Sequence, residues 1–411
     1  MIRFIRQAGR IAVILLWLGL VACGTGAGGR QTLLLISVDG LRWDARQLAH
    51  TPNLDSLAAK GVQAEALIPV FPTKTFPNHY SIVTGLYPEN HGIISNTMYD
   101  PVMDDTFALS IKEAVTDSRW WGGEPIWVTA EKQGLTAATL FWPGSEAVIK
   151  GVRPTYWKPY DHDMPHVDRV DQILSWLDLA VEGRPDFLTL YFHIVDTQSH
   201  YYGPKGDGTI AAIQKVDSTI GLLLTGLGQR GLSQTINIMI VSDHGMAAID
   251  TSRVIFLDDF VDPEIANVID WSVVTGMRPN ERNVDFVYDA LSNAHPRMSV
   301  YRRDEIPARL HYSAHHRIPT IIAMAEEGWS ITTRDNYSRQ PTRFIGGAHG
   351  YDNRYRSMGG VFIAYGPAFG SGKTLPAFSS VNLYNLMSVV LQLKPASNDG
   401  DFTIVKGALA R

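Results

Sequence analysis

Three largely apolar segments constrain the fold of this chain more than any other feature of its sequence. They cover residues 33–38, 187–193 and 236–241. Short apolar runs without polar alternation fit strands that are buried on both faces of a parallel sheet. Between the last two segments, residues 209–227 place apolar side chains at helical spacing. The sequence therefore predicts an α/β fold with a mostly parallel central sheet flanked by helices.

Polar side chains that can bind ligands follow each of these segments. Asp39 follows the first segment, and Asp243 and His244 follow the third. Asp196 and His200 follow the second, four residues apart, so they share one face if that stretch is helical. Each residue alone has an ordinary structural use, such as a helix cap or a surface contact. Because open α/β sheets bind ligands at the carboxyl ends of their strands, we expect these side chains to line one site.

Thr75 adds a hydroxyl group to this set of candidates. Prolines at positions 72 and 77 surround it, and the pattern predicts a helix over residues 77–84 that ends at Gly85. The hydroxyl just ahead of that helix is either an ordinary N-cap or a nucleophile that receives a phosphoryl group. The local pattern favours the cap. The other candidate residues favour the nucleophile.

Two loops contribute further candidates. His349 lies in a glycine-rich loop, and Asn96 lies in a loop where it is either a turn residue or a donor to an anion. Mixed carboxylate and imidazole ligands suit zinc, and two neighbouring ions can hold both the attacking and the leaving oxygen of a phosphoryl transfer. The candidates for two such ions are Asp39, Thr75, Asp196, His200, Asp243, His244 and His349.

The order and spacing of these residues resemble the nucleotide pyrophosphatase/phosphodiesterase family of the alkaline phosphatase superfamily, and in particular its bacterial members. The segments that carry the resemblance are residues 37–40, 71–96, 191–204, 242–246, 347–352 and 383–395. The resemblance implies an alkaline-phosphatase-like fold and two zinc ions. One ion would take Asp196, His200 and His349, and the other would take Asp39, Asp243 and His244 with the Thr75 oxygen.

The resemblance also implies the activity. Nucleotide phosphodiester or pyrophosphate bonds would be hydrolysed to nucleoside monophosphates, with Thr75 rather than Thr73 forming a phosphothreonine intermediate. Asn96 and the backbone N–H after the nucleophile would hold a phosphate oxygen. Three aromatic residues would line a slot for the nucleobase: Phe76, Tyr160 and Tyr191.

Other functions stay open from the sequence alone. One is a related phosphatase, phosphonate hydrolase or lipid phosphodiester hydrolase of the same superfamily. Another, of a different class, is a lipoprotein that binds a ligand without turnover. The net charge of -5, spread without long charge runs, argues against a protein that coats nucleic acid.

The first residues predict export. Arginines precede the apolar residues 11–22, a run that is short for a membrane span and typical of a signal peptide. It ends in Leu-Val-Ala-Cys-Gly, which resembles a bacterial lipobox, and Cys23 is the single cysteine of the chain. We therefore expect a signal peptide over residues 1–22 and a protein anchored to the membrane by lipid at Cys23, facing the periplasm. The alternative is a plain signal peptide with an incidental cysteine.

The rest of the chain divides into a tether and a catalytic domain. Residues 23–31 are glycine-rich and would form a flexible tether, and residues 32–411 would form the phosphodiesterase domain. From about residue 251 to 343 the alternation of buried strands and helices fades. We expect an inserted subdomain there, with a small antiparallel sheet of its own. The pattern then predicts a strand over 361–365 and a closing helix over 381–393.

Overall fold

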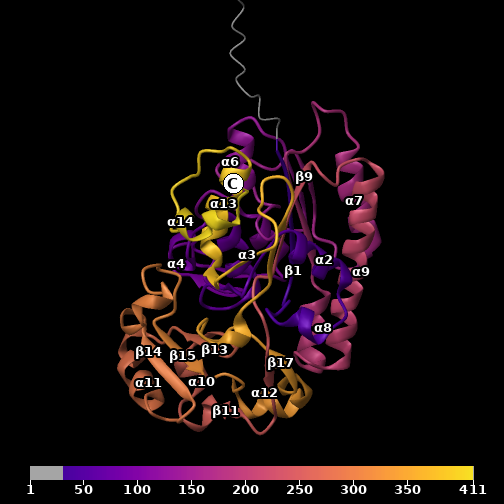
Figure 1. Ribbon diagram of the computed structural model, residues 1–411. Helices are drawn as coiled ribbons and strands as arrows, with labels where there is room; N and C mark the ends of the chain where they lie inside the picture. Colours follow the sequence, from indigo (N-terminus) through magenta and orange to yellow (C-terminus); the bar gives the residue numbers. More distant parts are fainter. Residues whose placement is uncertain (1–30, 411) are drawn as a thin grey trace, which may run out of the picture. The chain divides into compact units, whose positions relative to one another are not determined.

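The structure, a computed structural model, describes residues 31–410, and Figure 1 shows their arrangement. A central sheet of eight strands dominates it. The strands lie in the order β19 (Lys373–Leu375), β2 (Val62–Ala64), β18 (Phe362–Tyr365), β9 (Ile236–Val241), β1 (Thr32–Val38), β8 (Phe187–Phe192), β6 (Ala137–Leu140) and β7 (Tyr156–Lys158).

The sheet is mostly parallel, as predicted. Strand β1 pairs in parallel with β8 on one side and β9 on the other, and β6 continues in parallel from β8. Strand β18 is the exception near the centre, because it runs antiparallel to both β9 and β2. An apolar run predicts a buried strand but gives no information about its direction, so the sequence did not reveal this reversal.

Strand β1 is buried on both faces, which explains why its sequence lacks polar alternation. Successive side chains of a strand point to opposite faces. Leu33 and Leu35 join one hydrophobic core, and Leu34 and Ile36 join the other. Figure 1 shows helices on both sides of β1 and β9. One side holds α3 (Thr75–Thr84), α6 (Ile126–Lys132) and α13 (Leu383–Val390), and the other holds α2 (Pro52–Lys60), α7 (His166–Leu177) and α9 (Asp207–Gln229).

Helix α9 is the helix predicted over residues 209–227, extended by two residues at each end. By length and composition it is apolar enough to cross a membrane. Half of that apolar stretch is buried, however, and residues such as Val216 and Leu223 belong to the core beneath the central sheet. We therefore assign α9 to the core of the fold. Helix α13 begins two residues later than predicted because residues 380–382 form a separate 3₁₀ turn, and it ends three residues earlier than predicted, at Val390.

A second, smaller sheet lies within the range expected to hold an insertion. It is antiparallel, and its strands are β12 (Val268–Asp270), β13 (Val274–Met277), β15 (Ile321–Ala325) and β14 (Met298–Arg302) in spatial order. Helix α11 (Val284–Leu291) contributes Val287 and Leu291 to its core. These residues belong to the same hydrophobic cluster as one face of the central sheet. A separate inserted subdomain over 251–343 therefore stays a prediction.

Candidate metal centre

Six aspartate and histidine side chains meet at the carboxyl ends of three neighbouring strands. Strands β9, β1 and β8 lie side by side, so side chains that follow them reach one edge of the sheet. Helix α8 (Ile194–Tyr202) follows β8, and the short strand β17 (Gly346–Ala348) ends beside α8. The six residues are Asp39 after β1, Asp196 and His200 on α8, Asp243 and His244 after β9, and His349 after β17.

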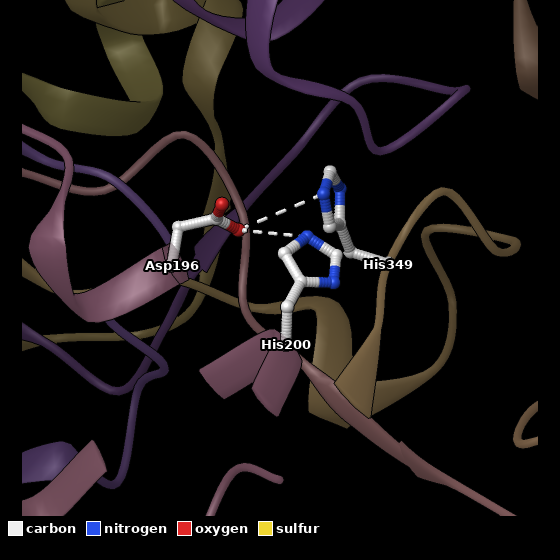
Figure 2. A group of neighbouring side chains, drawn as sticks. All are labelled: Asp196, His200 and His349. Carbon is white, nitrogen blue, oxygen red and sulfur yellow. Dashed lines mark ion pairs between the residues drawn. The ribbon is translucent and has the colours of Figure 1, made fainter. Parts of the chain in front are cut away.

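The first group consists of Asp196, His200 and His349 (Figure 2). The Oδ1 atom of Asp196 lies 3.5 Å from Nε2 of His200 and 3.6 Å from Nε2 of His349. Figure 2 shows both imidazole rings directed at the one carboxylate. Asp196 and His200 share a face of α8, as their spacing predicted for a helix.

The second group consists of Asp39, Asp243 and His244, which are buried and adjoin the first group. Nε2 of His244 lies 3.0 Å from Oδ2 of Asp243 and 3.5 Å from Oδ1 of Asp39. The Thr75 hydroxyl oxygen lies 3.4 Å from the same nitrogen. The rings of His244 and His349 stack with their centroids 3.6 Å apart, which joins the two groups. The structure thus brings all seven predicted metal residues together.

The three histidines are oriented by the main chain. Each ring has its Nδ1 atom within hydrogen-bond distance of a backbone carbonyl oxygen, in His200, His244 and His349 alike. A carbonyl only accepts hydrogen bonds, so each Nδ1 carries a proton, and in the neutral ring each Nε2 keeps a lone pair. That is the form of imidazole that binds a metal. The acceptors are the carbonyl groups of Gly347, Gly245 and Thr73, at 2.9, 2.9 and 2.8 Å.

The carboxylates leave oxygen atoms without hydrogen bonds. Oδ1 of Asp39, Oδ1 of Asp196 and Oδ2 of Asp243 are buried and have no hydrogen-bond partner among the described residues. A buried, unsatisfied carboxylate oxygen is costly, and here each one faces an imidazole lone pair. A divalent cation would satisfy both kinds of atom. The donor set therefore fits metal binding through nitrogen and oxygen ligands.

The pKa shifts of the aspartates and of His349 are also consistent with a bound cation. Burial raises the pKa of Asp39 well above its ordinary value, and the nearby Asp243 and Asp196 add to this. Burial also raises the pKa of Asp196 and lowers the pKa of His349 well below its usual range. Burial opposes ionisation of Asp243, but its histidine neighbours, first among them His244, outweigh it and lower its pKa. A cation that binds here would favour the ionised forms of Asp39 and Asp196.

His79 is a residue of this site that the sequence analysis missed. It is fully buried on α3, and its Nε2 lies 2.8 Å from the Ser37 hydroxyl oxygen. Its Nδ1 lies 2.9 Å from the Thr75 carbonyl oxygen and 3.4 Å from Oδ2 of Asp243. The ring therefore contacts both the turn that holds Thr75 and a candidate metal ligand. The only signal in the sequence was its position one helical turn after Thr75.

Thr75 is the first residue of α3 instead of the residue ahead of the helix. The helix begins two residues earlier than predicted, because Pro77 still lies in the first turn, where its missing N–H costs nothing. Lys74 occupies the N-cap position and makes no capping hydrogen bond with its side chain. The interpretation of Thr75 as an ordinary N-cap is therefore wrong, and its hydroxyl faces His244.

The neighbouring Thr73 is engaged elsewhere. Its hydroxyl is fully buried, donates to the Tyr351 carbonyl oxygen at 3.1 Å and accepts from the Gly350 N–H at 2.9 Å. A hydroxyl held by these two partners is poorly placed to attack a phosphate group. Between the two threonines of this segment, the geometry favours Thr75.

An aromatic cavity of about 390 Å³ opens beside Thr75 and Asp39. The rings of Tyr160 and Tyr191 lie with centroids 6.1 Å apart on its wall, and Tyr160 is 45% exposed. Tyr191 is buried, and its hydroxyl donates to Oδ2 of Asp39 at 2.6 Å. The aromatic residues on the wall are Phe76, Phe141, Trp142, Tyr160 and Tyr191. The three residues predicted to line a nucleobase slot therefore share one cavity.

Asn96 lies directly before β4 (Thr97–Asp100), close to the start of α3. Its side-chain carbonyl oxygen accepts the backbone N–H of Phe76 at 2.9 Å. This is the N–H that was expected to hold a phosphate oxygen together with Asn96. A phosphate oxygen must compete with Asn96 for that donor, whereas the NH₂ group of Asn96 is a donor in its own right.

Comparison with known proteins places the chain in a family. The model of the type I phosphodiesterase / nucleotide pyrophosphatase family matches residues 33–352, which include every candidate residue above. The chain belongs to this family.

Curated type I phosphodiesterases resemble the chain over most of its length. A venom phosphodiesterase of Macrovipera lebetinus is 40% identical over 390 residues, which cover 90% of this chain and 44% of the venom protein. An uncharacterized pyrophosphatase/phosphodiesterase of Schizosaccharomyces pombe is 38% identical over 391 residues, or 92% of this chain and 80% of the yeast protein. The chain spans less than half the length of the venom relative that it matches.

Solved structures of the family confirm the predicted alkaline-phosphatase-like fold. Human ectonucleotide pyrophosphatase/phosphodiesterase 5 is 36% identical, with a TM-score of 0.89 over 93% of this chain and 100% of the human chain. An inactive threonine-to-alanine variant of the murine protein, in complex with AMP, is 36% identical with a TM-score of 0.88 over 93% of this chain and 100% of the murine chain.

Proposed function

We propose that this type I phosphodiesterase hydrolyses nucleotide phosphodiester or pyrophosphate bonds to nucleoside monophosphates, with two zinc ions as cofactors. The observation that carries the proposal is the position of the Thr75 hydroxyl, which adjoins the metal residues and lines the aromatic cavity. Family membership supports it. So does the murine relative, whose inactive variant lacks a threonine and holds AMP.

The residues present fit two ions. In the proposed arrangement one ion takes Asp196, His200 and His349, and the other takes Asp39, Asp243 and His244 with the Thr75 oxygen. When bound, the ions supply positive charge that lowers the pKa of the threonine hydroxyl and balances the charge that develops on the phosphate. The three Nδ1–carbonyl bonds keep the rings in position for this.

The protein's own groups carry the reaction. Thr75 Oγ1 passes its proton to water and attacks phosphorus, the bond from phosphorus to the leaving oxygen breaks, and a phosphothreonine forms that still carries the nucleoside. Water then cleaves the phosphothreonine, which frees Thr75 and releases a nucleoside monophosphate. The start of α3 and the NH₂ group of Asn96 would hold the phosphate oxygens throughout. The aromatic cavity would hold the base.

The test of this proposal is substrate preference. A nitrophenyl ester of a nucleoside monophosphate should be cleaved far faster than nitrophenyl phosphate, because a base in the aromatic cavity can stabilise the transition state through remote binding. Catalytic efficiencies for these two esters and for a lipid phosphodiester, measured with zinc-loaded protein, decide the question. Equal or greater efficiency on the monoester or the lipid would favour another hydrolase of the superfamily, and no turnover would favour a binding protein.

Tyr160→Ala should lower kcat/KM for the nucleotide ester by about tenfold, because stacking on one base is worth roughly 1–3 kcal/mol. Cleavage of bis(nitrophenyl) phosphate, which has no base, should change little. Tyr288→Ala, which removes a tyrosine of α11 outside the cavity, is the matched control. Equal losses on both esters would contradict a nucleobase slot. Tyr191→Ala is a poorer test, because the Tyr191 hydroxyl also binds Asp39.

Export and lipid attachment are a separate proposal, because residues 1–30 lie outside the described part of the chain. It rests on the apolar run, the lipobox-like residues and the resemblance to bacterial members of the family. The relatives named above come from animals and a yeast, so the bacterial origin also stays a prediction. Names of relatives from cattle and rat that begin with "ectonucleotide" are consistent with export.

Cys23→Ala should move the enzyme from the membrane fraction to the soluble fraction of a bacterial host, because the acyl attachment point is lost. Activity in the two fractions and the intact mass of the mature protein measure the effect. The lipid anchor would be ruled out if the measured mass equals that of a chain that begins at residue 23 or 24 and carries no acyl chains.

A further inference from the structure

Lys74 and Asp270 form a buried ion pair next to the proposed nucleophile. The Lys74 ammonium donates to Oδ2 of Asp270, which ends strand β12 of the small sheet, and to the Ser95 hydroxyl at 3.0 Å. The Ser95 hydroxyl donates to the same Asp270 oxygen at 2.6 Å. The side chains of Lys74 and Asp270 are only 6% and 16% exposed. The small sheet thus supplies a carboxylate that neutralises the cation beside Thr75.

This ion pair lines a second cavity, of about 410 Å³, at the metal centre. Its wall includes His200 and His349, whereas the aromatic cavity is lined by Thr75, Asp39 and Asp196, and the two cavities share no lining residue. In an in-line reaction the leaving group departs on the side away from the nucleophile. With the nucleoside in the aromatic cavity, the leaving group would enter the second one.

Apart from the metal ion proposed at His200 and His349, the second cavity offers little positive charge to an anionic leaving group. Its basic side chains other than histidine are Lys74 and Arg343, and Asp270 already neutralises Lys74. Arg343 is exposed and donates to the Gln340 side chain at 3.0 Å. A pyrophosphate that reached Lys74 would have to displace Asp270 and would meet its negative charge. An alcohol or a nucleoside has no such cost, and Trp271 offers it an aromatic wall.

We propose that Asp270 is a specificity-determining residue that makes the enzyme prefer nucleotide esters with a weakly charged leaving group, such as an alcohol or a nucleoside, over nucleoside triphosphates. The inference rests on the proposed function, and it gives the small sheet a role in catalysis. The chemistry is the same for both classes. In the net reaction the oxygen of water forms a bond to the α-phosphorus and the bond from this phosphorus to the leaving oxygen breaks. A proton of water goes to the departing alcohol, or to solvent when pyrophosphate departs.

The test compares ATP with the nitrophenyl ester of thymidine monophosphate. In Asp270→Asn, the ratio of kcat/KM for ATP to that for the ester should rise about tenfold, because the freed ammonium can make a charge-assisted hydrogen bond to the pyrophosphate. In Lys74→Met the ratio should fall, because Asp270 is left as an unpaired negative charge. The double variant should lie between them. A purely structural role would not move the two single variants in opposite directions.

The matched control is Asp285→Asn, which removes an exposed carboxylate of α11 that does not line either cavity. The ratio should stay unchanged in this variant. An unchanged ratio in both Asp270→Asn and Lys74→Met, with both substrates still cleaved, would overturn the inference. Failure of the proposed function is distinguishable, because the unaltered enzyme would then cleave neither substrate.

A binding measurement supplies a readout that does not depend on turnover. In zinc-loaded Thr75→Ala protein, inorganic pyrophosphate should bind about tenfold more tightly when Asp270 is also replaced by asparagine. Titration calorimetry gives the two dissociation constants, and circular dichroism shows whether each variant is folded. If Asp270→Asn fails to fold, Lys74→Met carries the test alone, with weaker pyrophosphate binding expected. Unchanged affinity would count against the inference.

Discussion

Thr75→Ala is expected to lower the turnover of nucleotide esters by about 10⁴-fold or more, because the group that attacks phosphorus is lost. Zinc content should stay near normal, since the six aspartate and histidine residues of the metal centre remain. Single-turnover kinetics with a chromogenic nucleotide ester and metal analysis of the purified variant measure both quantities.

Two further substitutions sharpen this prediction. Thr75→Ser keeps a hydroxyl at the start of α3 and should retain measurable activity. After acid quenching, residue 75 of the unaltered enzyme and of Thr75→Ser should carry a nucleoside monophosphate, and residue 75 of Thr75→Ala should carry none. Activity near that of the unaltered enzyme in Thr75→Ala would mean that water or Thr73 attacks phosphorus. The buried bonds of Thr73 to Tyr351 and Gly350 argue against the second possibility.

Metal removal is expected to abolish activity and to lower the melting temperature, and this loss of stability should be larger near pH 8 than near pH 5. Burial raises the pKa of Asp39 and Asp196 above their values in the unfolded chain. A raised pKa contributes stability that is complete below the unfolded pKa and is lost as the pH rises through the folded pKa. The contribution of these two carboxylates to the stability of the metal-free protein should therefore fall as the pH increases from 5 to 8. The lowered pKa of His349 acts in the opposite direction, but equally in the metal-free and metal-loaded protein, where this ring is neutral.

A cation bound to Asp39 and Asp196 keeps both carboxylates ionised, so the metal-loaded protein should not lose stability through them as the pH rises. Ligand protonation also weakens metal binding at acid pH, which acts in the same direction. Asp243, whose pKa is lowered, contributes stability above its unfolded pKa and loses it only in strong acid, outside the window. Thermal melts with chelator and with zinc at several pH values provide the measurement. A gap between the two melting temperatures that does not depend on pH would refute this account, and activity that survives chelation would refute the metal centre.

The sequence predicted the residues whose positions follow from strand ends. Asp39 and Asp243 follow buried strands β1 and β9, and parallel pairing of neighbouring strands brings such residues together without further information. The helical spacing of Asp196 and His200 predicted their shared face in the same way. The central sheet and the helix over 209–227 were likewise readable from periodicity.

Other parts of the site depend on packing between distant segments. Asp270 meets Lys74 across 196 positions of sequence, and this contact exists only because the small sheet packs at the edge of the metal centre. His79 acquires its role from its neighbours Ser37 and Asp243, neither of which lies in its own helix. The antiparallel direction of β18 also depends on tertiary packing, which local patterns do not encode. The start of α3 was misplaced for a local reason, because a proline is tolerated at more than one position of the first turn.

The carbonyl groups that orient the three histidines have a consequence for engineering the enzyme. Two of them belong to Gly245 and Gly347, where an added Cβ would lie 2.1 Å from the Ser357 carbonyl oxygen and 2.5 Å from that of Ser199. A side chain at either position would push the loop aside and rotate the ring that depends on it. Because these acceptors are backbone carbonyl groups, the orientation of the imidazole rings depends on the shape of the loops. Attempts to change the metal preference should therefore redesign whole loops and leave the ligands in place.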